Sequence, residues 1–253
     1  MASTIRLVTY NIHKCRGWDR RVSPQRIARV LASLDADCIA LQEVVDGSPI
    51  GRSNQAREIC DALGDKYKLV FGRNRDLRGA DYGNATLTRL PVARSENYNI
   101  TWKHREPRGC LRTDLRLSSG AVLHVFNVHL GTSYLERRAQ GPLLLSDRML
   151  NHVAHTGPRV ILGDFNEWAR GLTSELMAKQ FRKIHLRQHQ PKRGSFPGPL
   201  PVLELDHIYY DDQLELVGFE LARTRLSLVA SDHLPLLAEF KLPSPSTLIQ
   251  GRG

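Results

Sequence analysis

One segment constrains the fold more than any other. The apolar run Val160-Ile161-Leu162 is followed at once by Gly163-Asp164-Phe165-Asn166. A short apolar run bounded by turn residues is typical of a buried strand. A strand that ends in Asp and Asn places two oxygen-bearing side chains at the rim of a sheet. We therefore expect a sheet with polar, oxygen-bearing side chains where its strands end.

The same arrangement, an apolar run followed by polar residues, recurs along the chain. The segments are Val8–His13, Ile39–Glu43, Val125–His129 and the stretch around Ser231-Asp232-His233. A fold that converges these strand ends on one cleft would collect seven polar side chains: Asn11, Glu43, His129, Asp164, Asn166, Asp232 and His233. Such a cleft is where metal-assisted phosphate chemistry can be built.

Apolar spacing predicts four helices. The first begins at Ser23-Pro24, as N-cap and first position, and the second ends at Gly64. The third covers 134–152 with an interruption at Gly141-Pro142, and the fourth covers 174–179. The predicted strands are 5–12, 37–43, 67–71, 83–89, 110–117, 121–129, 159–163, 202–210, 214–221 and 234–241. Many strands follow one another directly, which favours two mixed sheets packed face to face with helices outside over a purely alternating βα fold.

The chain is expected to form one domain over 1–242, followed by a Pro/Ser-rich tail over 243–253 that frays. The loop from Arg187 to Pro201 contains Lys192 and Arg193. It is either an ordinary surface connection or a lip that faces the substrate, because it leads into the strand that carries Asp206.

Charge and cysteine usage narrow the class of protein. The net charge is +10 and the excess is mainly arginine, which matches phosphate oxygens two at a time. Charge alone fits a merely solvated basic surface as well as a polyanionic partner, whereas a basic surface around a phosphoesterase cleft favours a polyanion such as nucleic acid or an anionic lipid surface. Cysteines 15, 38, 60 and 110 have no zinc-ligand spacing, and Cys38 and Cys60 fall on apolar faces. With neither a membrane-spanning run nor room for a signal peptide, we expect a cytoplasmic monomer with reduced thiols.

Seven sequence blocks together identify a family resemblance. They are TYNIH, LQEV, YGNATLTR, NVHL, GDFN, LDHIYY and SDHLPL, and they run in order from Thr9 to Leu236. In this the chain resembles the endonuclease/exonuclease/phosphatase superfamily, which holds deoxyribonuclease I, the abasic-site endonucleases, bacterial sphingomyelinases and inositol-polyphosphate phosphatases. The resemblance implies a deoxyribonuclease I-like α/β (α+β) fold, a four-layer sandwich of two mixed β-sheets flanked by helices.

The resemblance also implies a metal centre. Glu43, Asn11 and Asp232 match the ligand positions, and hard oxygen ligands suit Mg²⁺ or Mn²⁺. Asp164 matches the residue that orients or deprotonates the attacking water, and Asn166 the one that holds the scissile phosphate. The alternative for this pair is an Asx-type turn after the strand.

Two histidines complete the implied catalytic set. Asp206 matches the carboxylate that orients His233, whose cationic form can stabilise charge on the phosphoryl oxygens. His129 is the candidate general acid for the leaving oxygen, with Asp81 as its candidate partner. His207 should point to the opposite face of its strand from Asp206.

Residues at the cleft are implied to bind the substrate. Asn84 and Arg105 match positions that line the cleft or contact phosphate, with Arg108 and Arg112 as nearby alternatives to Arg105. Trp18 and Cys15 follow the first strand and are expected to border the cleft. These two have no assigned role.

The expected function is a Mg²⁺-dependent phosphodiesterase, a nuclease acting on DNA or other nucleic acid. The enzymatic alternatives are a phospholipid or sphingomyelin-type phosphodiesterase and a small-molecule phosphatase. Glu204-Leu205-Asp206-His207-Ile208 departs from the inositol-phosphatase pattern, and the long apolar hairpin of large sphingomyelinases has no obvious counterpart. The non-enzymatic alternative is a basic nucleic-acid-binding module, but a decayed site should have lost polar residues and this chain retains all seven.

Overall fold

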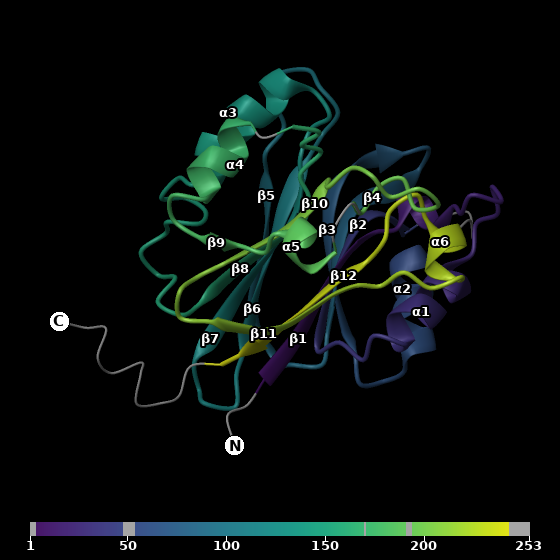
Figure 1. The fold of residues 1–253 in the computed structure, drawn as a ribbon, viewed down its shortest axis with the longest axis horizontal. Helices are drawn as coiled ribbons and strands as arrows, with labels where there is room; N and C mark the ends of the chain where they lie inside the picture. The colour runs from purple at the N-terminus through teal and green to yellow at the C-terminus, as the bar shows by residue number, and fades with distance from the viewer. Residues whose placement is uncertain (1–3, 48–53, 170, 191–193, 243–253) are drawn as a thin grey trace.

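The computed structural model describes residues 4–47, 54–169, 171–190 and 194–242, in which two six-stranded sheets pack face to face (Figure 1). The first sheet has the order β11 (Glu215–Leu221), β12 (Leu236–Lys241), β1 (Thr4–Asn11), β2 (Cys38–Asp46), β4 (Ala80–Thr88) and β3 (Lys68–Leu77). The second has the order β5 (Val92–Asn99), β6 (Gly109–Arg116), β7 (Val122–His129), β8 (Arg159–Asp164), β10 (Asp206–Tyr210) and β9 (Arg182–Lys183). Among the strands of the described residues, the β1–β2 and β7–β8 pairs are parallel and the others antiparallel, so both sheets are mixed.

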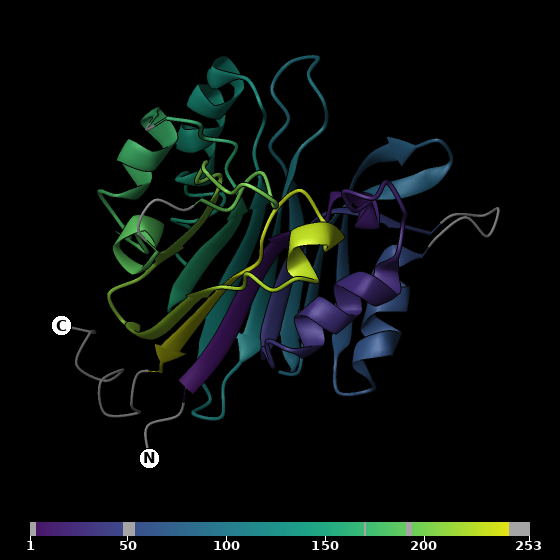
Figure 2. The same ribbon diagram turned by 45° about the vertical axis from the view of Figure 1, so that its right-hand side comes forward.

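Helices lie outside the two sheets, as Figures 1 and 2 show. On one side are α1 (Pro24–Ala32), α2 (Gln55–Leu63) and α6 (Ser227–Ala230); on the other are α3 (Tyr134–Leu144) and α4 (Leu172–Met177). A short 3-10 turn, η1 (His13–Cys15), follows β1, and α5 (Leu186–His189) follows β9. Within the described part of the chain, no helix is both long and apolar enough to cross a membrane.

Three layers of apolar side chains hold these elements together. One lies between the first sheet and α1 and α2, one between the two sheets, and one between the second sheet and α3 and α4. All four cysteines are free and buried in these layers. The four-layer sandwich and the two mixed sheets expected from the sequence are therefore confirmed.

Strand alternation decides which side chains face between the sheets, because successive side chains point to opposite faces. In β1, Ile5 and Leu7 belong to the layer between the sheets, whereas Val8 and Tyr10 belong to the layer under the helices. Asn11 has the parity of Ile5 and Leu7. It therefore faces the second sheet from the end of its strand.

Several predicted boundaries were wrong. The strand predicted at 67–71 continues to Leu77, and the one predicted at 202–210 begins only at Asp206. The third helix ends at Leu144 instead of reaching 152, and it continues through Pro142. The edge strand β5 was missed, because its polar sequence lacks the apolar alternation that marks a half-buried strand. The tail over 243–253 lies outside the described residues.

Candidate active site

The polar strand ends meet at one edge of the space between the sheets. Asp164 is at their centre: its Oδ2 accepts a hydrogen bond from Nδ2 of Asn11 at 2.9 Å. Nε2 of His129 lies 3.7 Å and Nε2 of His233 lies 3.6 Å from the same oxygen. The residues involved come from β1, β7, β8 and the segment before β12. Both sheets therefore contribute to this cluster.

Glu43 reaches the cluster through a β-bulge. The pairing of β2 with β4 shifts between Leu41 and Val44, and Glu43 has a φ of 58°. Without the extra residue, Glu43 would share the helix-facing side of Leu41. The bulge instead lets both Gln42 and Glu43 face between the sheets. Glu43 Oε1 consequently accepts a hydrogen bond from Asn11 Nδ2 at 3.3 Å.

The segment after β8 is a tight turn. The backbone N–H of Asn166 donates to Oδ1 of Asp164 at 2.8 Å, which is the Asx-type turn that the sequence offered as an alternative. Asn166 has a φ of 50°, and its Nδ2 donates to the carbonyl of Leu130 at 3.0 Å. A Cβ on Gly163 would lie 1.9 Å from the carbonyl oxygen of Val128, so this position requires glycine. The turn fixes Asp164 and carries Asn166 beside it.

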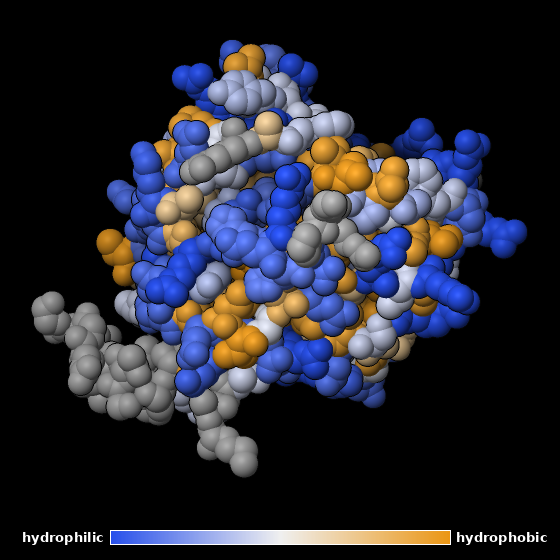
Figure 3. All heavy atoms as spheres, in the orientation of Figure 1, coloured by the Kyte–Doolittle hydropathy of each residue, from blue (hydrophilic) through white to orange (hydrophobic). Residues whose placement is uncertain are grey.

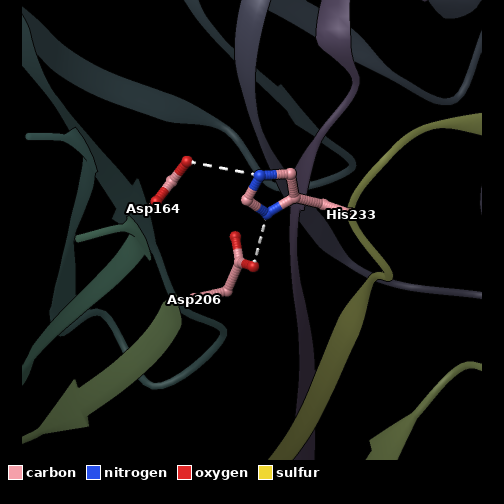
Figure 4. Close-up of side chains that lie close together, drawn as sticks. All are labelled: Asp164, Asp206 and His233. Carbon is pink, nitrogen blue, oxygen red and sulfur yellow. Dashed lines mark hydrogen bonds and ion pairs between the residues drawn. The ribbon is translucent and has the colours of Figure 1, made fainter. Parts of the chain in front are cut away.

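His233 lies between two carboxylates (Figure 4). Its Nδ1 is 2.7 Å from Oδ2 of Asp206, and its Nε2 faces Asp164. Burial lowers the pKa of His233, but Asp206 and Asp164 outweigh burial and raise it to about 10. His233 is therefore an imidazolium at neutral pH. Burial raises the pKa of Asp164 above its ordinary value, although the His233 charge opposes the change.

His129 has the opposite protonation state. Burial, together with the neighbouring Arg108, lowers the pKa of His129 to about 4. Arg108 Nη1 lies 3.3 Å from His129 Nδ1, and a guanidinium can only donate. The proton of the neutral ring is thus on Nε2, facing Asp164. Asp81 is not the partner expected for His129, since it pairs with Arg73 at the exposed edge and its side chain is 41% exposed.

Three of the predicted residues could hold a cation. Glu43 and Asn11 are in contact, and Asp232 lies nearby, because Ser231 Oγ bonds to the carbonyl of Asn11 at 2.8 Å. The Lys14 ammonium already contacts Oε2 of Glu43, so a positive charge fits against this carboxylate. Burial acts to raise the pKa of Glu43, but the cationic form that His129 takes in acid and the Lys14 ammonium outweigh it and hold the pKa well below its ordinary value. The carboxylate oxygens of Glu43 and Asp232 fit Mg²⁺ or Mn²⁺, and the second lone pair on Oδ1 of Asn11, which accepts the N–H of His13 at 3.0 Å, is a further hard oxygen donor.

A second group, Asp164, Asp206 and His233, also has its ligand atoms within 4.8 Å of one another. Both nitrogens of His233 already face carboxylates, and the ring is protonated. An imidazolium has no lone pair for a metal. This group is therefore better suited to proton chemistry than to metal binding.

The residues expected to touch substrate differ in their positions. Asn84 is fully buried, and its Nδ2 donates to the carbonyls of Gly109 and Asn127 at 3.1 and 3.2 Å, which ties β4 to the second sheet. Arg108 is buried beside His129, whereas Arg105 is exposed. Arg112 bonds to Tyr98 and faces away from the space between the sheets, so it is not an alternative.

Sequence reasoning missed several supporting side chains. His13 Nδ1 lies 3.4 Å from Oδ2 of Asp232, and Lys14 pairs with Glu43. Asn127 bonds to Leu41, Ala85 and Gln42, and so joins the two sheets directly behind the cluster. The inward parity of Gln42 and Asn127 was a usable signal, because an amide at a core position must find a partner.

The described part of the loop before β10 borders the cluster. Residues 194–203 form a short hairpin in which the ring of Phe196 lies 5.0 Å from that of His233. The backbone N–H of Gly198 donates to the carbonyl of Asp232 at 2.7 Å. Of the two alternatives for this segment, this position agrees with the lip rather than with an ordinary surface connection, while Lys192 and Arg193 lie outside the described residues. Trp18 is exposed near this hairpin, whereas Cys15 is fully buried.

A cavity of about 930 Å³ lies elsewhere, on the outer face of β10. His207 lines it and points away from the side that carries Asp206, as alternation predicts. Lys183 and Glu204 pair there at 3.2 Å. The size of this cavity does not make it the reaction site, because the clustered histidines and carboxylates lie on the other face of the strand.

Comparison with known proteins agrees with this arrangement. The model of the Endonuclease/Exonuclease/phosphatase family matches residues 8–233, which contain every residue of the cluster. The chain belongs to this family. In Escherichia coli, the "Uncharacterized protein YbhP" is 28% identical over 251 residues, covering 94% of this chain and 97% of that protein.

Solved structures of this family share the fold. An endonuclease/exonuclease/phosphatase from Beutenbergia cavernae has a TM-score of 0.79 and 21% identity, covering 96% of this chain and 72% of that one. A Bacteroides thetaiotaomicron mannosyl-6-phosphatase has a TM-score of 0.75 and 18% identity, covering 93% of this chain and 99% of that one. Identities this low establish a common fold, and the family places the chain among phosphoester hydrolases.

Proposed function

We propose that the protein is a divalent-metal-dependent phosphodiesterase that cleaves a P–O bond by in-line attack of water. The observation that carries the proposal is the convergence of Asn11, His129 and His233 on one carboxylate oxygen of Asp164. The three side chains hold this buried carboxylate in one orientation at the point where the strand ends meet. It is a suitable proton acceptor surrounded by hydrogen-bond donors.

Each residue has a defined role in this proposal. Asp164 accepts the proton of the attacking water, and its raised pKa brings it closer to neutrality, where a general base works best. His233 stabilises the charge that develops on the phosphoryl oxygens. His129 donates a hydrogen bond from Nε2 toward the leaving oxygen, and Asn166 holds the phosphate. The bond from water oxygen to phosphorus forms while the bond to the leaving oxygen breaks, and that oxygen departs with the electron pair and takes a proton from solvent water.

Glu43, Asn11 and Asp232 are proposed to hold the metal. When bound, a Mg²⁺ or Mn²⁺ ion would supply charge neutralisation to the phosphate. Glu43 contributes a buried carboxylate to this set, and Asn11 connects it to Asp164. The Lys14 ammonium would have to move aside when such an ion binds, because it contacts the same carboxylate.

Nucleic acid is the first substrate candidate, because the chain has a net charge of +10 and arginines at the cleft. A phospholipid is the second candidate, and one observation favours it: apolar side chains are exposed on the loops beside Asp232 and His233. A purely nucleic-acid-binding module is the non-enzymatic alternative. An intact catalytic set argues against it.

An activity panel tests the proposal. Plasmid DNA, RNA, phospholipid vesicles and a phosphomonoester are each incubated with Mg²⁺, Mn²⁺ or EDTA. We expect cleavage of a phosphodiester that EDTA abolishes, and no cleavage by Asp164→Asn. Binding without turnover on every substrate would instead support the non-enzymatic module.

A further inference from the structure

Two neighbouring loops and the short helix α6 expose apolar side chains next to the candidate active site. We name these side chains the docking rim: Trp18 (51% exposed), Val22 (57%), Leu200 (70%), Val202 (50%) and Val229 (39%). Single exposed apolar residues are normal on a protein surface. Five of them beside a reaction centre form a more specific feature. Figure 3 shows hydrophobic side chains on this face around the segment that leads into β10.

Backbone contacts hold the docking rim together. The N–H of Trp18 donates to the carbonyl of Val229 at 3.1 Å. Nε1 of Trp18 lies 3.4 Å from the position that a Cβ on Gly198 would take, so Trp18 also borders the hairpin that carries Leu200 and Val202. Val22 is on the same loop as Trp18, where it bridges to Arg16.

The docking rim adjoins the reaction centre. Gly198 bonds to the carbonyl of Asp232, and Phe196 of the same hairpin packs on His233. The other loop follows His13, which contacts Asp232 directly. A surface that bound the docking rim would therefore lie at the mouth of the proposed phosphodiesterase site.

The charges around the docking rim are positive. The exposed arginines nearby are Arg16, Arg20 and Arg21 on the loop of Trp18, and Arg223 and Arg225 on the segment just before α6. Asp19 is the acidic residue of the first loop, and its charge is matched by Arg26 at 2.7 Å. Apolar tips flanked by arginines are the composition of a surface that enters the boundary of an anionic bilayer.

We propose that the docking rim seats the protein on an anionic phospholipid surface, with the active site facing the headgroup phosphates. The inference rests on the proposed phosphodiesterase and specifies its substrate class. Leu200, Val202 and Val229 gain nothing from nucleic-acid phosphates, because such contacts are made by charged and polar groups. They gain from leaving water for the acyl boundary. Each nearby arginine adds roughly fivefold to partitioning onto an anionic surface.

Vesicle sedimentation of the full-length protein tests the inference. Vesicles of phosphatidylcholine with or without phosphatidylglycerol serve as the probe. We expect strong binding only to the anionic vesicles. The double variant Trp18→Ser/Leu200→Ser should weaken binding at least tenfold. The matched control Leu143→Ser/Val153→Ser replaces apolar residues that are 37% and 90% exposed outside the docking rim, and it should bind as the wild type does.

A soluble diester separates this inference from the proposed function. Wild type, rim variant and control should hydrolyse bis(4-nitrophenyl) phosphate equally, because the docking rim does not touch the reacting atoms. If the wild type hydrolyses it but the rim variant binds vesicles as well as the wild type, the docking inference is wrong and the phosphodiesterase stands. If the wild type does not hydrolyse it, the proposed function fails first.

A charge variant gives a second, independent measurement. Arg20→Gln/Arg223→Gln replaces exposed side chains and leaves the apolar tips in place. We expect it to bind anionic vesicles about 25-fold more weakly, as two roughly fivefold losses imply. If it loses duplex DNA binding instead, while vesicle binding is unchanged, the partner of this surface is nucleic acid and the lipid inference is overturned.

Discussion

Nδ1 of His233 lies 2.7 Å from Oδ2 of Asp206, and this buried pair keeps the imidazole charged. Asp206 is opposite Asp164 in the pairing of β10 with β8. The carboxylate that charges the histidine and the carboxylate proposed as the base are therefore held on adjacent strands. Asp206 therefore sets both the orientation and the charge of the His233 ring that lies between the two carboxylates.

Asp206→Asn should lower activity and change how stability depends on pH. The pKa of His233 is about 10 in the folded protein against an ordinary 6.5, so the folded state retains a proton that the unfolded chain releases. This stabilisation is fully present below pH 6.5 and is lost as the pH rises toward 10. Urea unfolding at pH 6 and pH 9 should show a large loss of stability for the wild type and a smaller one for the variant. An identical loss in both proteins would mean that Asp206 does not charge His233.

Asp164→Asn and His233→Ala should each lower turnover by roughly 10²-fold or more, the range of a lost base or charge stabiliser. The double variant should lose less than the product of the two effects, since both act on the same phosphoryl group. Single-turnover rates on a phosphodiester measure this. Near wild-type turnover in either single variant would refute the role assigned to that residue.

Glu43→Gln should reduce activity by orders of magnitude while the protein stays folded, because it removes the charge proposed to bind the metal. Lys14→Met should have the opposite effect on metal affinity. It removes the ammonium that competes for Glu43, so less Mg²⁺ should give half-maximal activity. Metal titrations of activity, with circular dichroism as the folding control, measure both. Full activity of Glu43→Gln, or of the wild type in EDTA, would rule out the metal assignment.

Arg105→Ala and Arg108→Ala should have different effects, because Arg105 is exposed and Arg108 is buried. If DNA binds, replacing the exposed Arg105 should flatten the dependence of log affinity on log salt by about one phosphate contact. Arg108 is buried against His129 and lowers its pKa, so its loss should instead raise that pKa from about 4. Fluorescence anisotropy at several salt concentrations and NMR titration of His129 measure the two effects. A flat salt response for the wild type would argue against nucleic acid as the substrate.

Much of the fold was predictable because its strands are apolar and alternate. Asn11, His129 and Asp164 follow such runs, and alternation alone places them on the face between the sheets. The edge strand β5 was not predictable, because its pairing with β6 compensates for a polar sequence.

Which residues form the site was easier to predict than how their side chains are arranged in it. The bulge that turns Glu43 inward depends on the pairing of β2 with β4, and nothing in Gln42-Glu43-Val44 specifies it. Asp81 was the partner expected for His129, but Arg108 takes that position. Which of the two reaches His129 depends on where the loops next to β4 and β6 end, and the sequence does not specify this. The loop carrying Leu200 was recognised as a possible lip, but the pairing of Phe196 with Leu203 that folds it into a hairpin was not predicted.

The amide network behind the cluster has a mechanical consequence. Asn11 and Glu43 belong to the first sheet, whereas His129, Asp164 and Asp206 belong to the second, and Gln42 with Asn127 bonds the two sheets together just behind them. The distances between the cluster residues of the first sheet and those of the second are therefore fixed by the spacing between the two sheets. A substitution that lets the two sheets shift by a fraction of an ångström should therefore lower the activity while the protein remains folded.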